Sequence, residues 1–342
     1  MSHTDNVLVI GGAGFIGRRL VARLTDGGHA VTVASRSAGA RQGEDPRVVY
    51  RTANVADADR VSGLAEGMTV VYDLSMGAPS RWEDYEREVI GGAVNVARAC
   101  LRHGVRRLIY TSTISAIDLG GKGAVDETSP NVGNSPNRGM YARGKALAER
   151  ALVGLHAAER LPVVIFRPGL VLGPGGKLVH GGLGERASDT CVLGWGPGTY
   201  PLPCVLVDDV AQALVSAKDA PGVEGLTFNL AGDVRPTAAE YVQELRRRAL
   251  RNFRFYPRRL WAMQGGELAR WGVKTLARKP NVVLEPPGDM KSLTMSAPLD
   301  CSLAKRLLGW TPCADREEFF RQAIDPHLKP IPAGDLRREP VA

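Results

Sequence analysis

Cysteine is scarce in this sequence, and its cysteines are scattered. The chain has five, at positions 100, 191, 204, 301 and 313, with no Cys-x-x-Cys pair among them. This spacing argues against a disulfide framework and against a zinc site. We therefore expect a reducing compartment, the cytoplasm, and no bound metal.

Long apolar runs and a leader pattern are also missing. The best apolar run, Leu161 to Leu172, is interrupted by Arg167. It falls short of the roughly 18 uncharged apolar residues that a membrane-spanning helix needs. Residues 1–6 are polar and lack the apolar segment of a secretory signal. We therefore expect no membrane span and no signal peptide.

Basic residues outnumber acidic ones, but no nucleic-acid-binding motif accompanies them. The formal net charge is +8, and much of it lies in the run from Arg246 to Arg259. A basic surface alone does not indicate a nucleic-acid partner. With 342 residues, 44% hydrophobic and 23% charged, the chain fits an enzyme with one large domain and an appendage. We expect a small-molecule substrate and no nucleic acid.

The N-terminal residues have the pattern of a dinucleotide-binding turn. Residues 7–10 form an apolar run typical of a strand buried on both faces, and a helical pattern follows and ends near Gly27. Between them, Gly11 permits a tight turn, Gly14 the approach of a pyrophosphate, and Gly17 close packing of helix on strand. The phosphates would meet the amides at the beginning of the helix. The alternative is a purely structural glycine turn.

The end of the second expected strand, residues 30–34, indicates which cofactor binds. An acidic residue there would bind the ribose 2′-hydroxyl of NAD and repel the 2′-phosphate of NADP. This chain instead has Ser35, Arg36 and Ser37, which offer a phosphate site. The pattern favours NADP, with NAD as the alternative and a solvated arginine as the other interpretation of Arg36.

Strands and helices alternate through the first half of the chain. Further strands are expected at 48–50, 70–72 and 107–110, and helices at 58–64 and 89–100. This alternation predicts an α/β fold with a Rossmann-type, doubly wound parallel sheet. The third of these strands ends in Thr111-Ser112-Thr113, at the sheet edge where ligands bind in such folds.

A tyrosine and a lysine lie four residues apart, at Tyr141 and Lys145. On a helix they share one face, about 5–6 Å apart between Cβ atoms. A neighbouring ammonium favours the phenolate, so the pair can serve as a general acid and base nearer to neutral pH. The alternative is a solvated helix face.

Several motifs in family order resemble the extended short-chain dehydrogenase/reductase superfamily. The resemblance lies in the branch that holds NAD-dependent epimerases, dehydratases and 3β-hydroxysteroid dehydrogenase-like enzymes, and it runs from Val7 to about Pro312. The motifs are GGAGFIG at 11–17, YTST at 110–113, YARGK at 141–145, RPGLVLGP at 167–174, VDDVAQA at 207–213 and AKRLLGWTP at 304–312.

The resemblance implies a catalytic set of Thr113, Tyr141 and Lys145. Thr113 would hydrogen-bond the substrate oxygen, Tyr141 would exchange the proton, and Lys145 would hold the nicotinamide ribose and lower the pKa of the tyrosine. Thr111 and Ser112 are alternatives to Thr113, or simply cap local backbone. The residue pattern and the resemblance together assign cofactor binding to Gly11, Gly14, Phe15, Ile16, Gly17, Ser35, Arg36, Asn54, Val55, Leu74, Thr111, Tyr141, Lys145, Arg167, Pro168 and Gly169.

Departures from the family pattern bear on the reaction. Ile114-Ser115 stands where sugar dehydratases carry an Asp-Glu pair, so the groups that eliminate water are missing. Leu170 and Leu202 stand where nucleotide-sugar epimerases tend to carry an asparagine and an arginine that grip the diphosphate. Glu88 replaces an asparagine near the cofactor. We therefore expect an oxidoreductase that interconverts a secondary alcohol and a ketone on a fairly apolar substrate. The alternative is a nucleotide-sugar epimerase, and a non-catalytic sensor is disfavoured.

The remaining segments predict the domain organisation. The dinucleotide-binding domain is expected at 1–174 with 205–232 returning to it, and a smaller C-terminal substrate-binding domain at 175–204 and 233–330, before a loose tail at 331–342. His180 would be a solvated loop residue or a substrate contact.

Two surfaces of the expected fold are candidates for association. Residues 258–279 would form a basic amphipathic helix that covers the pocket or touches a membrane, or else an ordinary core-facing helix. A homodimer is expected through helices at 89–100 and 141–155, where small residues allow close approach.

Overall fold

The computed structural model describes residues 4–36, 45–77, 79–119, 124–279, 282–284, 286–294 and 298–328. Ser37 and the expected tail at 331–342 therefore lie outside the described residues.

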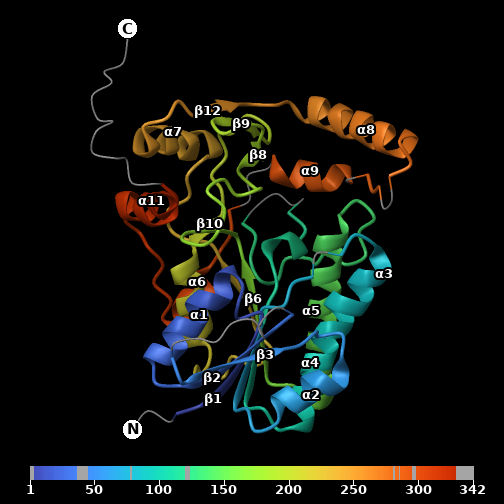
Figure 1. The fold of residues 1–342 in the computed structure, drawn as a ribbon, viewed down its shortest axis with the longest axis vertical. Helices are drawn as coiled ribbons and strands as arrows, with labels where there is room; N and C mark the ends of the chain where they lie inside the picture. Colours follow the sequence, from blue (N-terminus) through green and yellow to red (C-terminus); the bar gives the residue numbers. More distant parts are fainter. Residues whose placement is uncertain are drawn as a thin grey trace.

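A seven-stranded parallel sheet forms the centre of the larger part of the molecule (Figure 1). Its strand order is β11-β6-β5-β4-β1-β2-β3, and each neighbouring pair is parallel. The strands are β1 (Asn6–Ile10), β2 (Ala30–Ser35), β3 (Val48–Thr52), β4 (Val70–Asp73), β5 (Arg107–Thr111), β6 (Val163–Pro168) and β11 (Thr227–Leu230). The predicted doubly wound sheet is confirmed. The order of the strands along the chain reverses between β1 and β4, which is where such sheets bind ligands.

Helices cover both faces of this sheet. Helices α1 (Phe15–Asp26) and α6 (Val207–Ser216) contact each other on one face, and α2 (Ala58–Ala65), α4 (Gly91–Arg102) and α5 (Met140–Glu159) on the other. The short helix α3 (Trp82–Tyr85) and a π-helical turn, η2 (Glu86–Ile90), lead into α4, and a 3₁₀ turn, η3 (Ile114–Ala116), follows β5.

The residues of β1 explain why both layers form. Successive side chains of a strand point to opposite faces, so Val7 and Val9 pack with Leu20 of α1 while Leu8 and Ile10 pack with the α2 and α4 side. All four of these side chains are buried. A continuous apolar run is therefore what a strand covered on both faces requires.

A smaller part carries two short sheets. One sheet pairs β7 (Leu170–Leu172) with β10 (Cys204–Leu206), and the other has the order β12-β9-β8. The strands of this second sheet are β8 (Gly184–Arg186), β9 (Cys191–Gly194) and β12 (Arg254–Tyr256). The helices of the smaller part are α7 (Ala238–Ala249), α8 (Leu260–Leu276), α9 (Pro287–Leu293) and α11 (Arg316–Ile324), and a 3₁₀ turn, η4 (Asp325–His327), follows α11. Tyr241, Phe319 and Phe320 fill its core.

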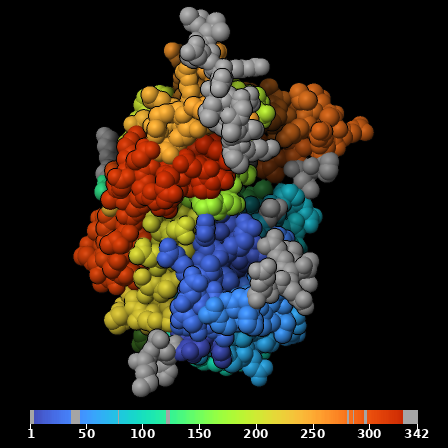
Figure 2. All heavy atoms as spheres, turned by 60° about the vertical axis from the view of Figure 1, so that its left-hand side comes forward, coloured from blue at the N-terminus to red at the C-terminus, as the bar shows by residue number. Residues whose placement is uncertain are grey.

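One segment expected in the smaller domain packs elsewhere. Helix α10 (Ser302–Leu308) and the buried Trp310 join the core between the large sheet and α6. The Trp310 indole donates a hydrogen bond to the Asp209 carbonyl at 2.9 Å. In the space-filling view the red C-terminal residues adjoin the yellow segment that contains α6 (Figure 2).

Helix α8 is not the core-facing helix that was one of the alternatives for residues 258–279. Met263 is its only buried residue, and the helix lies beside α9 at the edge of the molecule. No helix among the described residues is both long enough and apolar enough to cross a membrane.

Candidate active site

The glycine turn after β1 leaves no room for side chains. Gly11 has φ +79°, and a Cβ atom there would lie 2.6 Å from the Leu74 carbonyl oxygen. A Cβ on Gly17 would collide with the Gly11 carbonyl, so close packing of α1 on the turn requires that glycine. Gly14 forms the N-cap of α1 with no side-chain cap, and the first amides of the helix stay available to an anion.

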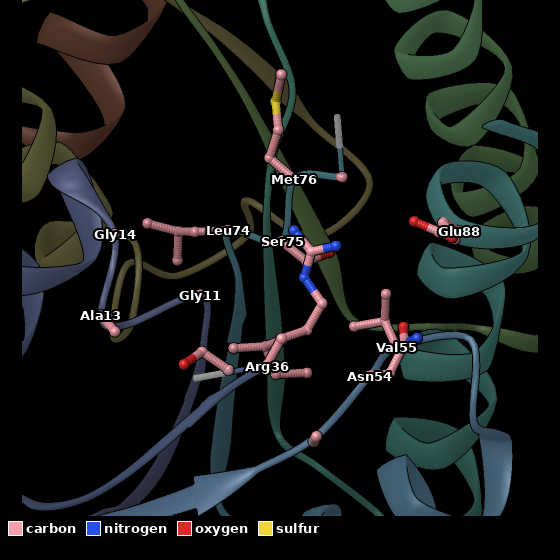
Figure 3. A pocket seen from close by; sticks show the side chains of 14 residues that line it. Gly11, Ala13, Gly14, Arg36, Asn54, Val55, Leu74, Ser75, Met76 and Glu88 are labelled. Carbon is pink, nitrogen blue, oxygen red and sulfur yellow. The ribbon is translucent and has the colours of Figure 1, made fainter. Parts of the chain in front are cut away.

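A groove of about 290 Å³ opens above this turn, at the point where the strand order reverses (Figure 3). Seven of the predicted cofactor residues line it, namely Gly11, Gly14, Ser35, Arg36, Asn54, Val55 and Leu74. Sequence reasoning did not assign six others to it, namely Ile10, Ala13, Ala53, Ser75, Met76 and Gly77. Ser75, Met76 and Gly77 directly follow a parallel strand, and this position was a signal that could have found them.

Arg36 extends from the end of β2 across the groove, toward Ser75 (Figure 3). Its side chain is exposed. Glu88 lines the groove on the same side as Asn54 and Val55 (Figure 3), and its carboxylate pairs with Arg87 at 2.8 Å. Arg36 therefore places a cation in the groove at the end of β2.

The other predicted cofactor residues lie outside the lining of this groove. A Cβ on Gly176 would lie 2.7 Å from the Phe15 ring, so Phe15 packs on that loop, and Ile16 packs against the core. The Arg167 guanidinium is held by Glu149 of α5 at 2.7 Å, with both side chains buried. This buried ion pair ties the side chain of Arg167 to α5. Pro168 is buried, and Gly169 lies against the Pro203 carbonyl, where any Cβ would collide.

Thr113 and Tyr141 meet at the carboxyl end of β5. Their hydroxyls share a hydrogen bond that lowers the pKa of Tyr141, but burial has the larger effect and raises this pKa above its ordinary value. Thr113 also accepts a hydrogen bond from the Ser115 amide at 3.2 Å. Thr113 therefore caps local backbone, which was the alternative role expected for Thr111 and Ser112. The buried hydroxyls of Thr111 and Ser112 instead have no hydrogen-bond partner among the described residues.

Lys145 does not act on the tyrosine as expected. Its buried ammonium donates to the Thr111 carbonyl at 2.9 Å and to the Tyr110 hydroxyl and the Ser75 carbonyl at 3.3 Å. Burial lowers the pKa of Lys145, and Lys145 is not among the groups that shift the pKa of Tyr141. The expected lowering of that pKa is therefore wrong for this structure: the phenol stays protonated at neutral pH.

Two residues beside Lys145 were missed from the sequence. The Tyr110 ring lies 4.7 Å from the Lys145 ammonium, and burial raises the pKa of Tyr110 well above its ordinary value. Asp73, at the end of β4, is buried and accepts a hydrogen bond from the Ser75 amide at 2.9 Å. Burial raises the pKa of Asp73 above its ordinary value, and the nearby Lys145 offsets part of this increase. Asp73 and Tyr110 lie at the ends of parallel strands, which the sequence pattern predicts. Their contact with Lys145 could not be predicted, because it depends on the tertiary fold.

The predicted substrate-side residues belong to the smaller part. Leu170 and Leu202 are partly buried and pack against its core. His180 accepts a hydrogen bond from the Gly182 amide at 3.0 Å, and burial lowers its pKa. His180 is therefore a partly buried neutral residue at pH 7, and the solvated loop histidine that we expected is wrong.

The residues present fit a nicotinamide dinucleotide. Side-chain-free positions at Gly11 and Gly14, the open first turn of α1 and the Arg36 cation form a cradle for a pyrophosphate and a ribose. When bound, the cofactor supplies or accepts a hydride.

Residues 7–231 match the family described as NAD dependent epimerase/dehydratase family. The chain belongs to this family. The epimerase/dehydratase match covers the seven-stranded sheet and the Thr113–Tyr141–Lys145 region, so the expected superfamily is confirmed, and the protein is an enzyme of the extended short-chain dehydrogenase/reductase type.

Curated relatives of this epimerase/dehydratase chain have different activities. A 2-alkyl-3-oxoalkanoate reductase of Stenotrophomonas maltophilia is 30% identical over 63% of this chain and 65% of its own length. A 3 beta-hydroxysteroid dehydrogenase/Delta 5→4-isomerase of Mycobacterium tuberculosis is 29% identical over 51% of this chain and 49% of its own. A UDP-glucose 4-epimerase of Vibrio cholerae is 26% identical over 95% of this chain and 96% of its own. The chain thus spans less than two thirds of the first two relatives.

Solved structures share the fold of this epimerase/dehydratase family member. A UDP-glucose 4-epimerase from Thermotoga maritima, bound to UDP-glucose, superposes with a TM-score of 0.71 at 21% identity, covering 94% of this chain and 98% of that one. An epimerase from Methanothermobacter thermautotrophicus superposes with a TM-score of 0.73 at 18% identity, covering 94% and 91%. These likenesses confirm the α/β architecture.

Proposed function

We propose that this protein is an NADP-dependent oxidoreductase that interconverts a secondary alcohol and a ketone on a fairly apolar substrate. The observation that carries the proposal is the Thr113–Tyr141 hydrogen bond at the carboxyl end of β5. With its pKa raised by burial, the Tyr141 phenol holds a proton that it can donate to a ketone oxygen. Thr113 hydrogen-bonds and orients that oxygen, and Lys145 holds the strand end through the Thr111 carbonyl.

Arg36 supports NADP over NAD. It reaches across the groove from the end of β2, and no acidic residue stands at positions 35–37 to repel a 2′-phosphate. Solved structures of the same fold carry NAD according to their descriptions, so NAD is the alternative cofactor.

Two leucines at positions where epimerases tend to carry diphosphate-binding side chains support a reductase over an epimerase. Leu170 and Leu202 cannot bind a diphosphate, and they pack on the apolar core of the smaller part. Two arginines of α7 that could take their place are already paired: Arg247 and Arg248 are held by Glu317 of α11, and Arg248 also pairs with Asp325. The names of two relatives, an oxoalkanoate reductase and a hydroxysteroid dehydrogenase, describe oxidoreductases of this kind.

The alternative is a nucleotide-sugar epimerase, which the Vibrio cholerae relative favours because it aligns over nearly the whole chain. Two measurements separate the two reactions. An oxidoreductase consumes NADPH in proportion to ketone reduced, as absorbance would show with a panel of steroid-like, flavonoid-like and alkyl ketones. Calorimetric titration with UDP in the presence of NADP should show weak binding, whereas micromolar affinity would overturn the reductase in favour of the epimerase.

The proposed setting is the reducing cytoplasm, which the five free cysteines support. The proposed associations are a homodimer and a peripheral membrane contact through residues 258–279. Both are independent of the reaction.

A further inference from the structure

Helix α8 is amphipathic in the reverse sense to a normal surface helix. At about 100° per residue, Glu267, Arg270 and Lys274 fall within roughly 40° of the buried Met263. On the opposite side, about 140–160° from Met263, lie Trp261, Leu268 and Leu276. Trp261 is 70% exposed, Leu268 54% and Leu276 86%.

Polar contacts fix this orientation. Arg270 pairs with Glu267 within the helix at 2.9 Å and lies 3.9 Å from Glu185 of β8, so one side chain of the charged face reaches the rest of the protein. The outward face is completed by small residues, Ala262, Gly265 and Ala269, all exposed. A surface helix normally shows its polar face to water, and the reversal presents an unpartnered apolar strip.

We propose that the apolar strip of α8, defined by Trp261, Leu268 and Leu276, docks on an anionic lipid surface. The positive charge around the strip indicates that the surface it contacts is anionic. Residues 251–279 contain eight basic residues and one acidic residue, nearly the whole positive excess of the chain. Arg259 at the beginning of the strip and Arg278 and Lys279 at its end are exposed. An apolar helical face between cations suits the boundary of an anionic bilayer.

A second copy of the chain fits the strip less well. Seventeen residues give a helix about 26 Å long and about 10 Å wide, or roughly 260 Å² of face, against the roughly 800 Å² per partner of a stable interface. Tryptophan is also enriched at membrane interfaces, where its ring is apolar and its N–H reaches water.

The rim of a second cavity adds to the cationic edge. Tyr200, Pro257, Arg258, Arg259 and Leu260 line a hollow beside the beginning of α8. Arg258 is held by Glu185 and stacks on Trp195, which leaves Arg259 as the exposed cation at this end of the strip.

Sedimentation of the full chain with vesicles tests this docking. With a roughly 3:1 mixture of phosphatidylcholine and phosphatidylserine, we expect binding that weakens as salt is raised, and little binding to phosphatidylcholine alone. Leu268→Glu should reduce the binding about tenfold or more by burying a charge. Arg278→Glu with Lys279→Glu, at the end of the strip, should also reduce it.

Leu307→Glu is the matched control, because Leu307 of α10 is 43% exposed on another face, and it should bind vesicles like the wild type. Reduction of a water-soluble ketone should be unchanged in Leu268→Glu, which keeps a failure of docking distinct from a failure of the proposed reaction.

Two results would overturn the proposal. One is no vesicle binding by the wild type at low salt. The other is equal loss in Leu268→Glu and Leu307→Glu. A wild-type dimer that Leu268→Glu converts to a monomer, without vesicle binding, would identify a second copy as the occupant instead.

Discussion

Single residues decide how protons move at this site. The Tyr141 phenol is partly buried and has a raised pKa. The Lys145 ammonium donates its hydrogen bonds to Thr111, Tyr110 and Ser75. In the proposed reaction, Tyr141 would therefore serve as the proton donor that ketone reduction needs.

Replacing Tyr141 by phenylalanine removes only that donor. We expect Tyr141→Phe to lower the rate of ketone reduction by about 10²–10⁴-fold, the usual contribution of general acid catalysis. NADPH affinity, measured by fluorescence titration, should be nearly unchanged because Tyr141 does not line the described groove. Tyr256→Phe, at an exposed tyrosine of β12, is the control. Full activity in Tyr141→Phe would contradict the mechanism.

We expect Arg36 to determine the choice of cofactor. Charge-assisted hydrogen bonds to a 2′-phosphate contribute about 1.5–3 kcal/mol, or roughly ten- to a hundredfold in affinity. Arg36→Ala should weaken NADPH binding by that factor and leave NADH binding nearly unchanged. Arg51→Ala, at an exposed arginine on the next strand outside the groove lining, should affect neither. Equal losses for both cofactors, or a wild type that prefers NADH, would count against NADP.

Asp209 sets a pH dependence of stability. Burial raises its pKa to about 6, above the ordinary 3.8, so folding favours the protonated form. Its contribution to stability is complete below pH 3.8 and is lost as the pH rises through about 6. Asp209→Asn cannot ionise and keeps an oxygen to accept from the Cys313 amide. The variant should therefore gain roughly 2 kcal/mol over the wild type between pH 4 and pH 8. Urea unfolding at both pH values measures this difference, and a constant difference would exclude it.

Elements far apart in the sequence meet at the beginning of α5. Asp289 of α9 bonds the Arg138 guanidinium at 2.6 Å and the Gly139 amide at 2.8 Å. Gly139 is the N-cap of α5, whose side chain provides no cap. The Asp289 carboxylate therefore caps the beginning of α5 in place of a local side chain, two residues before Tyr141.

Removing this carboxylate should affect both stability and catalysis. Asp289→Ala leaves the buried Arg138 without its carboxylate partner, at a cost of about 1–3 kcal/mol in the free energy of unfolding. It should also lower kcat about tenfold by loosening Tyr141. Asp189→Ala removes an ion pair with Arg186 at an 89% exposed carboxylate, and it should cost less than about 1 kcal/mol. Denaturant unfolding and steady-state kinetics of the two variants provide the comparison, and equal effects would refute a special role for Asp289.

At the scale of the whole molecule, the helices expected to pair in a homodimer are α4 and α5. The small residues that were to allow close approach, among them Gly92, Ala93, Ala97 and Ala99, are buried within the chain. A Cβ on Gly92 would lie 2.6 Å from the Val55 side chain, so this glycine serves packing inside one subunit. The dimer prediction therefore rests on the outer faces of the helices.

Light scattering at micromolar concentration should give twice the mass of the chain. Val153 of α5 is 43% exposed, and Val153→Arg should shift the mass toward a monomer by placing a charge in the expected interface. Leu307→Arg, at an equally exposed residue of α10, should not. A monomeric wild type would reject the dimer.

Local patterns in the sequence were sufficient to predict the strands and helices of the sheet, the glycine turn and half of the residues that line the groove. Strand burial repeats every two residues and helix burial every 3.6, and only glycine fits the turn at Gly11. Such constraints act between near neighbours in the chain, so they can be read without the fold.

Only the tertiary structure decided which distant side chains meet. It brought Lys145 to Tyr110 rather than to Tyr141, Arg167 to Glu149, and Asp289 to the beginning of α5. It also turned the apolar side of α8 outward, because Met263 and Arg270 hold the other side to the protein. Burial and pairing of charges depend on partners up to 213 residues away, as for Lys218 and Asp5, and no periodicity within one segment specifies them.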